Sequence, residues 1–173
     1  MSIAIQSPDD YLISSFLMAP SNISEGIDQD LSWNTIIKKS VRRLWDRTSI
    51  TFGEPLYDVV TSLFEIYKEC SVPNWDGYGA YSISEETYEE AFKIIDSLPS
   101  FIKMPEITCE PTGEIAFEWN KDGGQMFVVS VGGKHKINYA GIFAGNNKIH
   151  GSEDFEESLP APVINNLRRL YSY

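Results

Sequence analysis

The chain has 173 residues, of which 42% are hydrophobic and 13% aromatic, enough to bury a core and incompatible with general disorder. Its net charge of −11 opposes binding of the whole surface to nucleic acid or to an acidic membrane, because both are negatively charged. This excess of negative charge suits a soluble acidic protein or one with a basic partner.

Residues 1–33 join a short apolar run to a polar, turn-rich stretch, and we expect a partly irregular extension before a single domain over residues 34–173. The apolar run at residues 11–19 follows Asp9 and Asp10 and is too short to span a bilayer. It therefore does not resemble a signal peptide or a membrane helix. These features predict a cytoplasmic location and no membrane contact.

Three amphipathic helices are expected in the first 100 residues. They are predicted over residues 34–47, capped by Asn34, over residues 55–70, and from Ser84 to the residue before Pro99. Four glutamates of the third helix are expected to form one solvated face: Glu85, Glu86, Glu89 and Glu90. Cys70 and Cys109 are too few for a disulfide framework, and each is expected to be a separate small core residue.

After Pro105 the apolar residues alternate with polar ones, which is the period of a strand. Strands are expected over residues 106–110, 114–119, 125–131 and 134–140, with a weaker one at 148–150 and a helix after Leu159. Short glycine-containing turns separate them and require antiparallel neighbours, because a parallel crossover needs a dozen residues or more. We therefore predict an α+β fold: N-terminal helices, an antiparallel β-meander of about four strands and a C-terminal helix, packed in two layers.

The sequence contains no recognisable motif for nucleophilic or zinc chemistry. His135 and His150 are the only histidines, neither lies near a cysteine in sequence, and His135 is expected to face solvent between two lysines. Gly141–Gly145 lacks the Gly-Lys-Ser/Thr ending of a phosphate-binding loop. No catalytic residue, metal or cofactor is predicted.

Carboxylates leave one catalytic alternative open. Glu114 and Glu118 share a strand face about 13 Å apart, beyond the roughly 6.5–9.5 Å of an inverting glycosidase pair. A carboxylate-based hydrolase, with or without a metal ion, would require Asp76 to fold next to them.

Residues 34–47 contain five basic residues and one acidic residue, a net charge of +4 that leaves −15 for the rest of the chain. Arg42 and Arg43 are candidate interaction residues in this segment. Pairing with an acidic surface of the same chain or of another subunit is the favoured interpretation, and a homo-oligomer is one form of it. A DNA-binding regulator is the alternative, which the surrounding negative field opposes.

The segment Asn-Trp-Asp-Gly-Tyr-Gly-Ala at residues 74–80 is the most distinctive in the chain. Its glycines allow positive φ angles, and Asp76 can accept hydrogen bonds from backbone amides in an Asx-turn. One interpretation is an aromatic recognition loop with Trp75, Asp76 and Tyr78 as candidate interaction residues. A buried structural knuckle between helices is the interpretation that the sequence favours.

Three parts of the sequence resemble a group of small bacterial proteins with no established activity. They are Trp-Asp-Gly-Tyr-Gly-Ala at 75–80, Pro-Thr-Gly-Glu-Ile-Ala-Phe-Glu-Trp at 111–119 and a Leu-Pro before the last helix. The resemblance covers about residues 73–170, implies a bacterial or phage origin and transfers no functional residue. The function expected first is a non-enzymatic protein-interaction module, such as an immunity or antitoxin-like partner of a basic protein.

Overall fold

The computed structural model describes residues 54–171, all of which belong to one compact unit. The predicted extension and the basic helix with Arg42 and Arg43 lie outside the described residues. The order of elements is helix, helix, five strands and helix, as predicted for an α+β fold.

Helix α3 spans Glu54–Cys70, α4 spans Glu85–Ser97 and α5 spans Ala161–Tyr171. The predicted start of α4 at Ser84 is confirmed, and the structure adds that the Ser84 hydroxyl caps the helix by accepting a hydrogen bond from the backbone N–H of Thr87 at 3.1 Å. The apolar stripe of α3 is buried as its spacing indicates, and Leu63 within it is fully inaccessible to solvent.

The sheet is an antiparallel meander in the order β1-β2-β3-β4-β5. Its strands are Glu106–Cys109, Ile115–Lys121, Gln125–Val131, Lys136–Phe143 and Asn147–Asp154, with a 3-10 turn at Ala144–Asn146 joining the last two. The fifth strand is eight residues long, so the sheet has one more full strand than expected. Strand β4 begins two residues later than predicted, because His135 has a φ of 54° and lies in the preceding turn.

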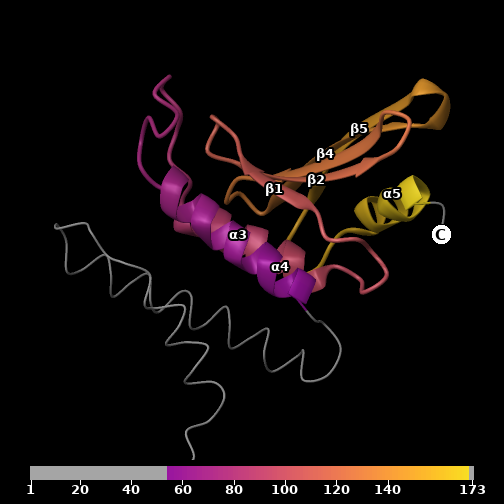
Figure 1. Cartoon of the computed structure of the whole chain (residues 1–173), viewed down its shortest axis with the longest axis horizontal. Coiled ribbons are helices and arrows are strands. Elements are labelled where there is room, and N and C mark those ends of the chain that lie inside the picture. The colour runs from indigo at the N-terminus through magenta and orange to yellow at the C-terminus, as the bar shows by residue number, and fades with distance from the viewer. Residues whose placement is uncertain (1–53, 172–173) are drawn as a thin grey trace, which may run out of the picture. The chain divides into compact units, whose positions relative to one another are not determined.

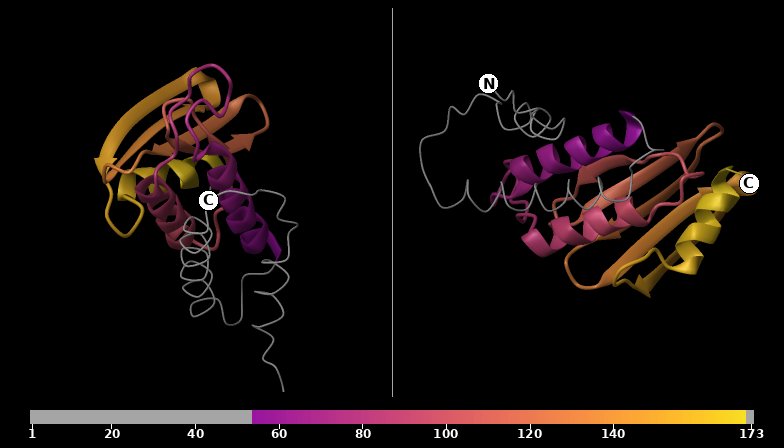
Figure 2. Two further views of the ribbon diagram at one scale, coloured as in Figure 1. Left: turned by 90° about the vertical axis from the view of Figure 1, so that its left-hand side faces the viewer. Right: turned by 90° about the horizontal axis from the view of Figure 1, so that it is seen from below.

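All three described helices cover the same face of the sheet (Figure 1), and the view from below shows α3 and α4 side by side with α5 beyond them at an angle (Figure 2). Ile115, Phe117 and Trp119 point from β2 into this layer and are at most 1% exposed. The predicted two-layer packing is therefore confirmed. None of the described helices is both long and apolar enough to cross a membrane.

Cys70 and Cys109 form a disulfide between the last residue of α3 and the last residue of β1. Cys70 is buried, as expected, but the prediction that the two cysteines are separate core residues is wrong. Helix α3 packs against β1, and this contact brings together two residues that are 39 positions apart in sequence.

Candidate interaction site

The connection between α3 and α4 contains a loop that its own side chains hold in place. Asp76 Oδ1 accepts hydrogen bonds from the backbone N–H groups of Tyr78 and Ala80, at 2.7 and 3.1 Å. Asn74 Oδ1 accepts another from the backbone N–H of Gly79 at 2.7 Å. Gly77 and Gly79 have φ angles of 76° and 98°, where a side chain would be strained. The Asx-turn expected at Asp76 is present.

Two further hydrogen bonds close the base of this loop. The backbone N–H of Ile83 donates to the carbonyl oxygen of Cys70 at 2.8 Å, which joins the start of the connection to its end. Trp75 Nε1 donates to the carbonyl oxygen of Tyr81 at 3.1 Å, so the indole lies along the loop. The loop is therefore an ordered surface feature whose shape does not depend on a partner.

The loop presents two tyrosines to solvent. Tyr78 is 95% exposed and Tyr81 is 72% exposed, while Ala80 between them is only 4% exposed and anchors the backbone. The favoured expectation of a buried knuckle is therefore wrong. Hydrogen bonds to the Asp76 and Asn74 side chains pair the backbone N–H groups of the loop and hold its shape. The loop therefore does not depend on burial of its tyrosines for its conformation.

The turn between β1 and β2 lies beside the loop. The backbone N–H of Tyr81 donates to the carbonyl oxygen of Pro111 at 2.9 Å. A Cβ atom on Gly113 would lie 3.0 Å from the carbonyl oxygen of Ser82, so only glycine allows this approach. The turn also carries two carboxylates, those of Glu110 and Glu114. We call residues 74–81 together with residues 110–114 the tyrosine-loop surface.

The carboxylates of the tyrosine-loop surface have different environments. Backbone hydrogen bonds, above all that from Tyr78, lower the pKa of Asp76. Burial, and after it the charge of Glu114, raises the pKa of Glu110. Asp76 therefore keeps its negative charge at moderately acidic pH, whereas Glu110 takes up a proton more readily than an ordinary glutamate.

Asp76, Glu114 and Glu118 each have a separate hydrogen-bond partner. Asp76 binds amides of its own loop, Glu114 Oε2 accepts from the Thr112 hydroxyl at 3.4 Å, and Glu118 Oε1 accepts from Asn120 Nδ2 at 2.6 Å. Glu114 lies in the turn beside the loop, but Glu118 lies further along β2, paired with Glu106 of β1. Among residues 54–171, no group of three or more acidic, histidine or cysteine side chains could hold a metal ion.

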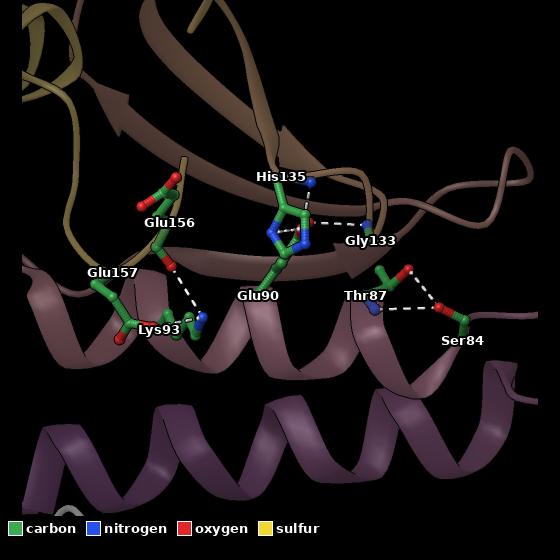
Figure 3. Close-up of polar contacts among 8 residues, drawn as sticks. All are labelled: Ser84, Thr87, Glu90, Lys93, Gly133, His135, Glu156 and Glu157. Atoms are coloured by element: carbon green, nitrogen blue, oxygen red, sulfur yellow. Dashed lines mark hydrogen bonds and ion pairs between the residues drawn. The ribbon is translucent and has the colours of Figure 1, made fainter. Parts of the chain in front are cut away.

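The sequence interpretation missed a buried charged residue, Glu90. It is 3% exposed, and its carboxylate accepts hydrogen bonds from the backbone N–H groups of Gly133 and His135 at 2.8 and 2.6 Å (Figure 3). The prediction that it belongs to a solvated glutamate face is wrong. Glu90 follows Thr87 by three residues and precedes Ile94 by four, which is the spacing of one helix face. Thr87 and Ile94 are both buried, so this spacing indicates that Glu90 also lies on the inner face of α4. His135 does face solvent, with a side chain that is 74% exposed.

Lowering the pH should loosen the loop through Asp76. Because its pKa lies below the ordinary value of 3.8, the carboxylate stabilises the folded loop above that pH, and the contribution is lost as the pH falls through the lowered value. In an NMR titration, the amide signals of Tyr78 and Ala80 should shift together with a midpoint below 3.8. Asp76→Ala should remove this transition and speed exchange of both amides severalfold. Asp122→Ala, in the turn between β2 and β3, is the matched control that should change neither.

No protein-family model, curated protein or solved structure matches the chain. The likeness to small bacterial proteins therefore stays a prediction. The function has to be argued from the geometry of the described residues.

Proposed function

We propose that the protein is a non-enzymatic interaction module that binds a basic partner protein through the tyrosine-loop surface. The observation that carries this proposal is Tyr78, whose side chain is 95% exposed on a loop fixed by internal hydrogen bonds. An aromatic side chain held so far from the core contributes little to folding. Its large surface and polar hydroxyl suit recognition of another molecule.

The rigidity of the loop supports binding rather than packing. Asp76 and Asn74 fix the backbone before any partner arrives, so little conformational entropy is lost when a complex forms. Tyrosine adds little to that cost, because its side chain has few rotatable bonds. The loop therefore has the properties of a preorganised recognition element.

Charge favours a basic partner. Asp76, Glu110 and Glu114 belong to the tyrosine-loop surface, and the chain as a whole carries −11. Lysine or arginine side chains of a partner could pair with these carboxylates and lie against the tyrosine rings. An immunity or antitoxin-like protein, which neutralises a basic toxin by covering it, is the class that combines an acidic body with such a surface.

Tyr78→Ser should weaken binding of the partner by about 30-fold, as expected when an interface hot spot is lost. The full chain is used as bait in cells that produce it, and the basic protein recovered in a 1:1 complex is purified. Its affinity for the wild type, for Tyr78→Ser and for Tyr81→Ser is then measured by calorimetry. Loss of affinity without a change in the unfolding curve supports the proposal.

Phe101→Ser is the matched control for that experiment. Phe101 is also an exposed aromatic residue, at 43%, but it follows α4 whereas the tyrosine loop precedes it. A helix of 13 residues separates the two sites by about 20 Å. Equal affinities for the wild type and both tyrosine variants, or equal losses in all three variants, would contradict a binding role for the tyrosine-loop surface.

The two alternatives lack a specific observation in their favour. A carboxylate hydrolase needs Asp76 and Glu118 at one cavity, and their hydrogen-bond partners differ. A DNA-binding regulator would use Arg42 and Arg43, outside the described residues.

The cytoplasmic location stays a prediction, and the thiol state of Cys70 and Cys109 in cells tests it, because stable disulfides are rare in that compartment.

A further inference from the structure

Strand β5 forms an open edge of the sheet within the described part of the chain. It pairs with β4 along its whole length, from Asn147 opposite Phe143 to Asp154 opposite Lys136, without an inserted residue. No other described strand lies beyond it, and none of its eight residues is fully buried. The opposite edge strand, β1, has only four residues and packs against α3. Strand β5 is therefore the edge that is long and regular enough to accept another strand.

The register shows which backbone groups of β5 face outward. The backbone N–H of Phe155 donates to the carbonyl oxygen of His135, the residue directly opposite it, so the backbone groups of Phe155 point toward the β4 side. Hydrogen-bonded and non-bonded pairs alternate along an antiparallel ladder. Glu153, Gly151 and Ile149 therefore direct their N–H and C=O groups toward β4. The outward groups belong to four residues, namely Lys148, His150, Ser152 and Asp154.

The side chains of β5 are arranged so that the strand complements itself. Lys148 and His150 lie in its first half, and Glu153 and Asp154 lie in its second half. If two copies pair antiparallel with Gly151 on the two-fold axis, Lys148 of each copy lies opposite Asp154 of the other, and His150 lies opposite Ser152. This register also joins outward-facing residues to outward-facing residues, as the hydrogen bonds require. We propose that the chain forms a homodimer through antiparallel pairing of β5 with β5 of a second copy, which makes one continuous ten-stranded sheet.

Gly151 suits the position on the axis. The side chain of Tyr139 in β4 lies over it, so that any Cβ atom at position 151 would collide with the tyrosine ring and hydroxyl. The Tyr139 hydroxyl also hydrogen-bonds to Glu153 at 3.4 Å. The helix side of β5 is thus filled from β4, and the strand backbone at Gly151 is free to approach a partner strand closely. The other face carries the Lys148 and Asp154 pairs, whose side chains are exposed.

This inference does not rest on the proposed function, because the tyrosine loop and β5 belong to different parts of the chain. Sedimentation of the full chain over a concentration series should show a monomer–dimer equilibrium. Lys148→Asp places two carboxylates opposite each other twice per dimer, so the dissociation constant should rise by about tenfold or more. The double variant Lys148→Asp with Asp154→Lys exchanges the charges and restores both pairs between the copies, so most of the lost dimerisation should return. It also replaces the ion pair of Lys136 with Asp154 inside each copy by two lysines, which Lys136→Asp in the same background repairs.

Lys134→Asp is the matched control, since it makes the same charge change in an exposed turn outside β5 and should leave the dimer intact. Hydrogen exchange gives a second measurement: the amides of Lys148, His150 and Ser152 should become protected as the concentration rises. A wild type that stays monomeric at all soluble concentrations would overturn the proposal. Three other results would also overturn it. The dimer could be insensitive to Lys148→Asp, or the charge exchange could fail to repair the loss of dimerisation. The β5 amides could also become protected only when a foreign peptide is added.

Discussion

Reduction of the disulfide between Cys70 and Cys109 should lower the free energy of unfolding by about 3–4 kcal/mol, the loss expected for a loop of this length in the chain-entropy treatment. The bond joins two residues 39 positions apart and closes a loop that contains the tyrosine loop and all of α4, so it restricts the unfolded chain far more than the folded one. Urea unfolding of the full chain, with and without a reducing agent, measures the difference. The tyrosine loop itself should keep its shape after reduction, because the hydrogen bond from Ile83 to Cys70 still closes its base.

The double variant Cys70→Ala with Cys109→Ala is the control for chemical effects of the reducing agent. Alanine is tolerated at Cys70 at a modest packing cost, since this buried side chain is small. Its unfolding curve should resemble that of the reduced wild type and should not respond to reductant. Identical curves for oxidised and reduced wild type would show that the disulfide does not stabilise the fold.

The elements that sequence reasoning found are those with a local signal. Ile115, Phe117 and Trp119 alternate with polar residues and are buried as predicted, and Ser84 is followed by a helix that its hydroxyl caps. Strand β5 has no such signal over most of its length, because Ile149 is its single large apolar residue. Its extent is set by pairing with β4, a contact between strands that the pattern within β5 cannot reveal.

In the candidate site too, the features with a local signal were predicted and those set by contacts between distant elements were not. The two glycines and Asp76 predict a tight turn, and the turn exists with the expected hydrogen bonds. Whether Tyr78 enters the core or faces solvent depends on where α3, α4 and the turn at Gly113 come together, which residues 74–80 alone do not encode. The pairing of Cys70 with Cys109 likewise depends on the contact of α3 with β1.

Glu90→Ala should lower the free energy of unfolding by about 3 kcal/mol. The Glu90 carboxylate lies on the inner face of α4 and holds the turn between β3 and β4 through the backbone N–H groups of Gly133 and His135 (Figure 3). Hydrogen bonds to a charged acceptor are stronger than neutral ones. Removing this acceptor leaves two amides without a partner in a part-buried site, each at a cost of about 1–3 kcal/mol.

Two variants separate this effect from loss of charge or of helix propensity. Glu65→Ala makes the same change at an exposed position of α3 and should alter stability by less than about 0.5 kcal/mol. Glu90→Gln keeps one acceptor oxygen but turns an NH₂ group toward the second amide, so its loss should approach that of alanine despite its matching shape. Hydrogen exchange should show the amides of Gly133 and His135 losing protection in both Glu90 variants. If Glu90→Ala destabilised the protein no more than Glu65→Ala, the turn would be held by its own backbone and not by the helix beneath it.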